Sequence, residues 1–161
     1  MPEILVVDDS ATDRRIAGGL LERQGGWCVS YAGDGQEALE RLESEPPHLI
    51  LTDLQMPEMN GLELVEAVQR QYPLIPVILM TAQGSERIAV EALESGAASY
   101  VPKDELSEDL VPVVDRVLAI AGEQQTRRSL MERMRSLQAN FVLSNDPALL
   151  TTAVAYLQGL I

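Results

Sequence analysis

The segment ILVVDDS, residues 4–10, places two aspartates directly after an apolar run. Leu49–Leu51 and Ile75–Met80 are further apolar runs, and a polar strand-end residue is expected after each of them. Runs that are apolar throughout are typical of central strands buried on both faces of a parallel sheet. Polar residues just beyond such strands are expected at the sheet edge where open α/β folds bind their ligands. The residues concerned are Asp8, Asp9, Asp53 and Thr81.

Strand-like runs alternate with helix-period segments from the N-terminus onward. The predicted strands are Ile4–Val7, Cys28–Tyr31, Leu49–Leu51, Ile75–Met80 and Ser99–Val101. The predicted helices between them are Thr12–Gln24, Gln36–Glu43, Leu62–Gln71 and Glu86–Glu94. Ser10 with Asp13 is typical of a helix N-cap, and Gly96 is typical of a helix end. Five strands alternating with helices predict a parallel sheet that is covered on both faces.

Composition excludes several kinds of site. Cys28 is the only cysteine and His48 the only histidine, so disulfide frameworks, zinc clusters and histidine-based catalytic pairs are excluded by count. We expect His48 to be a surface residue without a role. Any metal must therefore be bound by oxygen atoms.

Charge and hydropathy limit the partners. The net charge of -13 over 161 residues would repel a phosphate backbone, so we expect this chain not to bind nucleic acid. The longest purely apolar run, Ile4–Val7, is far shorter than a membrane span, and no secretion signal begins the sequence. These features predict a soluble, cytoplasmic protein.

Carboxylates gathered at one edge of a sheet need a cation. Two carboxylates 4 Å apart repel each other by about 4 kcal/mol at an effective dielectric constant near 20. Mg²⁺ suits such all-oxygen sites and leaves coordination positions for phosphate oxygens. The predicted cofactor is therefore Mg²⁺, with Asp8, Asp9 and Asp53 as its acidic ligands.

The same residue types fit phosphoryl transfer. An aspartate that faces the metal can attack phosphorus as a nucleophile, and Asp53 is the best placed. Lys103 is the only lysine beside eleven arginines, and it follows the fifth predicted strand. Its compact ammonium and the Thr81 hydroxyl would neutralise or bond the phosphoryl oxygens. Asp53, Thr81 and Lys103 are thus the predicted catalytic residues.

Four separated motifs in this order and spacing resemble those of bacterial response-regulator receiver domains. They are ILVVDDS at 4–10, LTDLQMPEMNG at 51–61, MTA at 80–82 and YVPK at 100–103. The resemblance covers roughly residues 2–121. It implies a flavodoxin-like, doubly wound five-stranded parallel sheet of order 2-1-3-4-5 with an extended C-terminal helix. It also implies a two-component signalling protein that accepts a phosphoryl group from a sensor histidine kinase or phosphotransfer protein and switches an output domain or partner.

The resemblance assigns roles within the metal site. It implies Mg²⁺ held by Asp9, Asp53 and the backbone carbonyl of Gln55, with Asp8 acting through water. Asp53 would take the phosphoryl group.

It also implies a switch. Thr81 would move to bond the phosphate, Tyr100 would turn inward behind it, and Lys103 would hold a phosphate oxygen. The sequence departs from the family at Asp104, where many receivers have a proline with a cis bond. A cis bond without proline costs about 3 to 4 kcal/mol, so we expect either a trans path or a strained loop there.

Two other classes of protein share features of this sequence. Phosphotransferases of the haloacid-dehalogenase type also use a strand-end aspartate, but they need an acid two residues later, where this chain has Gln55. We therefore expect no enzyme activity beyond self-phosphorylation and slow dephosphorylation. The second alternative is a receiver-like binding module that works without phosphorylation.

From Asp109 the sequence predicts a long helix that runs to Asn140 and would reach about 48 Å. Gln124 and Arg127 interrupt its heptad pattern, so dimerisation through it is permitted but not required. Phe141–Leu143 is strand-like, and a helix is predicted from Asp146. The predicted division is a receiver at 2–121, a linker or signalling helix at 122–140, and the start of a second domain at 141–161. That last part weakly resembles the start of anti-sigma-type ATP-binding kinase domains.

Overall fold

A computed structural model describes residues 1–82 and 86–143 of the chain. The strands are β1 (Glu3–Val7), β2 (Cys28–Ala32), β3 (Leu49–Asp53), β4 (Val77–Thr81) and β5 (Ser99–Pro102). The helices are α1 (Ala11–Leu20), α2 (Gly35–Ser44), α3 (Gly61–Gln71), α4 (Glu86–Glu94) and α5 (Leu106–Leu143). A π-helical turn (Leu21–Gly25) follows α1, and a 3-10 turn (Lys103–Glu105) precedes α5. All strands pair in parallel in the order β2-β1-β3-β4-β5, which confirms the predicted flavodoxin-like fold with a long C-terminal helix.

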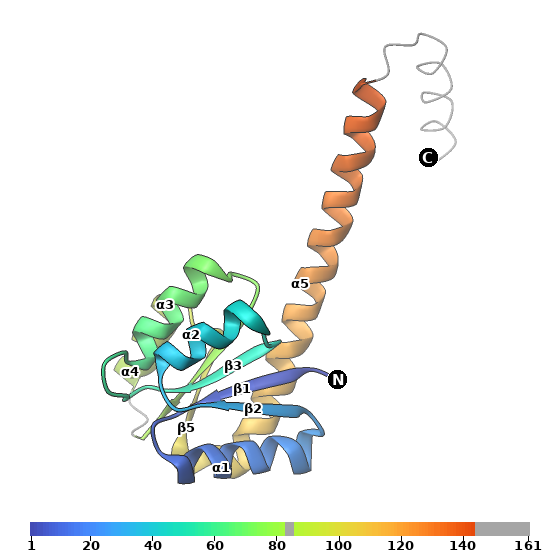
Figure 1. Cartoon of the computed structure of the whole chain (residues 1–161). Coiled ribbons are helices and arrows are strands. Elements are labelled where there is room, and N and C mark those ends of the chain that lie inside the picture. The colour runs from blue at the N-terminus through green and yellow to red at the C-terminus, as the bar shows by residue number, and fades with distance from the viewer. Residues whose placement is uncertain (83–85, 144–161) are drawn as a thin grey trace. The chain divides into compact units, whose positions relative to one another are not determined.

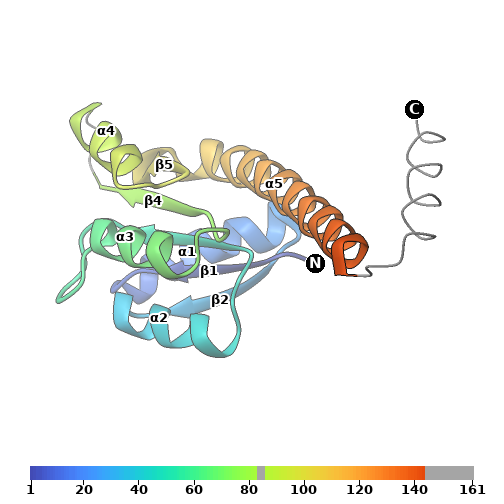
Figure 2. The ribbon, with the colours of Figure 1, turned by 90° about the horizontal axis from the view of Figure 1, so that it is seen from above.

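Helices cover both faces of the sheet (Figures 1 and 2). Leu5 and Val7 of β1 belong to the core beneath α2 and α3, whereas Ile4 and Val6 belong to the core beneath α1 and the first turns of α5. Successive side chains of a strand point to opposite faces, so a strand between two helical layers must be apolar at every position. This is why the sequence of β1 does not alternate.

Two predicted strand ends differ from the structure. Asp53 and Thr81 are the last residues of β3 and β4, whereas the sequence placed them just beyond these strands. The ladder continues to them because Asp53 pairs with Met80 and Thr81 pairs with Pro102. Their backbones are therefore fixed by strand pairing, and both residues are buried.

The C-terminal helix is longer than predicted. It begins at Leu106 rather than Asp109 and continues to Leu143, with Pro112 inside it. The strand predicted at Phe141–Leu143 is wrong, because these residues end α5. A run of three apolar residues cannot distinguish strand from helix by its periodicity.

The chain forms two compact units, residues 1–122 and residues 123–161. The linker and second domain stay predictions, and the helix predicted from Asp146 lies outside the described residues. Within the described ranges, no helix combines the length and apolar character needed to cross a membrane.

Candidate functional site

The turn between β1 and α1 fixes Asp8. Ser10 is the N-cap of α1, and its side-chain Oγ accepts a hydrogen bond from the backbone N–H of Asp13 at 3.3 Å. The backbone N–H of Ser10 in turn donates to Oδ1 of Asp8 at 2.8 Å. Arg14 donates to the Asp8 carbonyl oxygen. Asp8 is consequently held by its own turn, although it is completely buried.

Asp53 ends β3 and faces the same edge of the sheet. Its Oδ2 accepts a hydrogen bond from the backbone N–H of Gln55 at 3.1 Å. Burial raises the pKa of the Asp53 carboxyl and the neighbouring Asp8 charge adds to this, although Lys103 and the Gln55 N–H act in the opposite direction. The net result is a raised pKa of Asp53, so keeping its carboxyl ionised costs free energy in the folded state.

The predicted acidic cluster is present in the structure. One carboxylate oxygen from each of Asp8, Asp9 and Asp53 lies within 4.8 Å of the others. Asp8 and Asp53 are buried, and Asp9 is exposed. An all-oxygen set of three carboxylates, partly open to solvent, fits a hard cation such as Mg²⁺, which commonly keeps several waters.

Lys103 lies within this acidic edge. Its Nζ is 2.8 Å from Oδ2 of Asp8, 2.8 Å from Oδ2 of Asp13 and 3.1 Å from Oδ1 of Asp53. Burial alone would lower the pKa of Lys103, but its bonds to these three carboxylates raise it above the ordinary 10.5. The ammonium therefore stays charged and offsets part of the negative charge of the cluster.

Thr81 ends β4, the strand next to β3, and Tyr100 lies on β5, the strand beyond β4. Thr81 is 1% exposed, and its Oγ1 has no hydrogen-bond partner among the residues that the structure describes. A buried hydroxyl without a partner costs about 1 to 3 kcal/mol and calls for an explanation. Tyr100 is half-buried and packs against the core beneath α2 and α3. The structure thus offers one unused hydroxyl at the end of β4.

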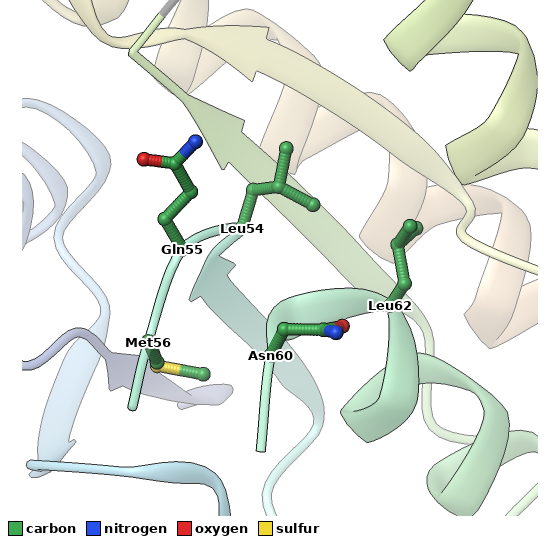
Figure 3. A pocket seen from close by; sticks show the side chains of 5 residues that line it. All are labelled: Leu54, Gln55, Met56, Asn60 and Leu62. Atoms are coloured by element: carbon green, nitrogen blue, oxygen red, sulfur yellow. The ribbon is translucent and has the colours of Figure 1, made fainter. Parts of the chain in front are cut away.

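The loop after Asp53 borders a shallow depression. Figure 3 shows the side chains of Gln55 and Met56 leaving this loop in different directions, with Asn60 at the start of α3. The depression has a volume of about 490 Å³, and it is lined by Leu54, Gln55, Met56, Asn60 and Leu62. Its lining begins with Leu54, the residue directly after Asp53, so the depression borders the same loop as the acidic cluster.

The Lys103–Asp104 bond is trans, since no cis peptide bond occurs in the described residues. The chain instead enters a 3-10 turn at Lys103. This resolves the two expectations for the loop in favour of a trans path. The ammonium reaches the acidic edge without a proline at position 104.

Sequence reasoning missed two contacts. The sequence pattern predicts Asp13 only as part of the helix cap, yet its Oδ2 accepts a hydrogen bond from Lys103. His48 was given no role, yet its Nδ1 accepts a hydrogen bond from the backbone N–H of Glu3 at 3.1 Å, which ties the start of β1 to the start of β3. The position of Asp13, an acid in the first helical turn after the loop of Asp8 and Asp9, could have indicated a role at the site. Nothing in the sequence indicates the partner of His48.

A doubly wound parallel sheet with converging carboxylates at its carboxyl edge defines the chain as an α/β protein of the class that binds ligands at that edge. Residues 4–115 match the model of the response regulator receiver domain, and the chain belongs to this family.

Similar proteins support the assignment. The DNA-binding transcriptional regulator NtrC of Escherichia coli K12 is 35% identical over 127 residues, which are 79% of this chain and 27% of NtrC. A CheY-like receiver domain from Methanospirillum hungatei superposes with a TM-score of 0.70 at 29% identity, covering 77% of this chain and 98% of the other. Vibrio cholerae CheY4 superposes with a TM-score of 0.67 at 33% identity, covering 73% and 98%. The chain thus spans roughly a quarter of the length of NtrC.

Proposed function

We propose that this receiver accepts a phosphoryl group on Asp53 from the phosphohistidine of a sensor histidine kinase or phosphotransfer protein. The observation that carries the proposal is the buried edge where Asp53 meets two further carboxylates and the Lys103 ammonium. The second candidate function is a binding module that works without phosphorylation. Such a module would not need a cluster of mutually repelling carboxylates.

The carboxylate of Asp53 is oriented for attack on phosphorus. The Gln55 N–H holds Oδ2 and Lys103 holds Oδ1, so the carboxylate cannot turn freely. A carboxylate oxygen forms the new P–O bond while the P–N bond to the donor histidine breaks, and the imidazole leaves with the electron pair. No further reactant is needed.

Three groups would share the charge of the phosphoryl oxygens. Mg²⁺ held by Asp8, Asp9, Asp53 and the Gln55 carbonyl would supply electrostatic stabilisation. Lys103 would donate a hydrogen bond to one oxygen, and the partnerless Thr81 hydroxyl would donate to another. Thr81 and Tyr100 would then form the switch that changes the adjoining surface.

Receiver domains act between histidine kinases and output domains, and the same placement is proposed for this chain. NtrC is a DNA-binding transcriptional regulator. We propose that the receiver itself contacts neither nucleic acid nor membrane. We also propose a cytoplasmic location and no catalysis beyond the gain and slow loss of its own phosphoryl group.

Incubation with a small acyl phosphate and Mg²⁺ should add one phosphoryl group to the wild-type chain, as intact-protein mass spectrometry would show. Asp53→Asn should remove the adduct, because an amide is a poor nucleophile. Asp34→Asn, which changes the N-cap of α2 outside the acidic cluster, serves as the matched control and should keep it. Absence of the adduct from the wild type, with or without Mg²⁺, would favour the binding-module alternative.

Asp9→Ala should separate metal binding from folding. Asp9 is an exposed member of a repelling cluster, so its removal in chelator should leave the unfolding midpoint unchanged or raised. Saturating Mg²⁺ should stabilise the wild type by about 2.7 kcal/mol at a hundred times its Kd, and the variant should not share this gain. Asp109→Ala, an exposed acid in the first turn of α5, should behave as wild type in thermal unfolding. A strongly destabilised Asp9→Ala in chelator would count against the site.

A further inference from the structure

Asp13 differs from the other carboxylates that bond Lys103. Asp8 and Asp53 belong to the candidate cation cluster, together with Asp9. Asp13 is absent from that cluster among the described residues, yet its Oδ2 lies 2.8 Å from the Lys103 Nζ. Asp8 and Asp53 would therefore be shared with a cation, whereas Asp13 is dedicated to the lysine.

The fold places Asp13 opposite the lysine. It occupies the third position of α1, where the cap residue Ser10 holds its backbone N–H. Its side chain is 38% exposed and crosses to the turn that follows β5, ninety residues along the chain. The pair joins α1 to the segment that carries Lys103, and that segment begins with a 3-10 turn.

The donors of Lys103 are fully used. An ammonium has three N–H groups, and here they face Asp8, Asp13 and Asp53. A divalent cation at the cluster would attract Asp8 and Asp53 and repel the ammonium. The bond to Asp13 is the one contact that this competition leaves intact.

We propose that Asp13 is a positioning residue, which keeps the Lys103 ammonium beside Asp53 when a divalent cation enters the acidic cluster. This inference rests on the proposed function, and it gives Asp13 a defined part in phosphorylation. The Lys103 N–H that faces Oδ1 of Asp53 then donates its hydrogen bond to a phosphoryl oxygen, while the hydrogen bond from Lys103 to Asp13 is kept. Asp13 itself touches neither the metal nor the phosphoryl group.

A single lysine allows a direct test of the anchor. Protein labelled with ¹³C-lysine gives the signals of Lys103 alone, and its two Hε protons are distinct only while the side chain is fixed. In wild type they should stay distinct before and after Mg²⁺ is added. In Asp13→Asn they should merge after Mg²⁺ is added. Glu108→Gln, which removes an acid from the first turn of α5, should behave as wild type.

Phosphorylation provides the second measurement. At saturating Mg²⁺ the rate constant with an acyl phosphate should fall roughly tenfold in Asp13→Asn, because a displaced catalytic group loses its orientation. Asp13→Glu should restore a large part of the rate, which a general loss of stability would not predict. Thermal unfolding of each variant identifies any that fails to fold.

The lysine signals and the phosphorylation rate test the proposal independently of each other. Merged Hε signals in wild type, or distinct signals in Asp13→Asn with Mg²⁺, would overturn the anchor. An equal rate constant in wild type and Asp13→Asn would overturn it as well. If wild type forms no phosphoadduct at all, the proposed function fails, and the lysine signals still decide whether Asp13 holds Lys103.

Discussion

Gly61→Ala should destabilise the receiver by roughly 3 kcal/mol or more, the upper part of the range for overpacking. Gly61 begins α3, and its N–H donates to the Leu54 carbonyl at 2.9 Å. A Cβ there would lie 2.3 Å from the backbone carbonyl oxygen of Asp53 and 2.9 Å from the Leu54 Cα. Backbone atoms cannot rotate away as a flexible side chain can, so α3 and the end of β3 would have to separate.

The same change should disturb the site, because the carbonyl that meets the new methyl belongs to Asp53. Urea unfolding measures the stability, and the rate of adduct formation measures the site. Gly19→Ala is the matched control, since its added Cβ meets only the far end of Arg23 at 3.5 Å. Alanine also favours a helix over glycine by about 1 kcal/mol, so the control should be neutral or stabilising. Equal stability of the two variants would refute the proposed clash.

Lys103→Met should lower the free energy of unfolding by roughly 3 kcal/mol in chelator at neutral pH, as expected when one partner of a buried ion pair is removed. The side chain of Asp8 is 0% exposed, that of Asp53 is 8% exposed and that of Lys103 is 20% exposed. Methionine keeps the apolar stem but removes the ammonium, which leaves the carboxylates to repel one another. Mg²⁺ should restore part of the lost stability in the variant, because it supplies the missing positive charge.

The matched control is Arg41→Met, which removes the cation of an exposed pair with Glu37 on α2. Such a pair contributes about 0.3 to 0.5 kcal/mol, so the two losses measured by urea unfolding should differ severalfold. Because its partners raise the folded-state pKa of Lys103, its contribution is fully present below the ordinary value of 10.5 and is lost as pH rises through the folded value. The difference between wild type and Lys103→Met should therefore not decrease from neutral pH to about pH 9. A loss no larger than that of Arg41→Met would show that the ammonium does not balance the cluster.

The sequence predicted the sheet for a specific reason. Three runs that are apolar at every position leave little choice but strands between two helical layers, and the polar residues at their ends had to meet at one edge. Asp8, Asp9 and Asp53 were named from that pattern, and their oxygens do converge in the structure. Their chemical roles remain predictions to be tested by the phosphorylation and metal-binding experiments.

Short or locally ambiguous segments were harder to predict. Asp53 and Thr81 lie within their strands because pairing with neighbouring strands extends the ladder, and this pairing is not visible in one segment alone. The strand prediction at Phe141–Leu143 is wrong because three apolar residues carry too little periodicity to distinguish a strand from a helix. The preceding helix α5 continues through them.

The sequence by itself determined the fold class, the strand order through its family resemblance, and the residues at the acidic edge. Local patterns were sufficient for the fold class and the acidic residues, because hydrophobic periodicity and turn residues act over short distances, whereas the strand order follows only from the resemblance. Only the tertiary structure decided that Asp13 shares Lys103, since α1 and the turn after β5 are ninety residues apart and meet only when the sheet forms. The same holds for Gly61, whose need to be glycine comes from a backbone carbonyl of another element.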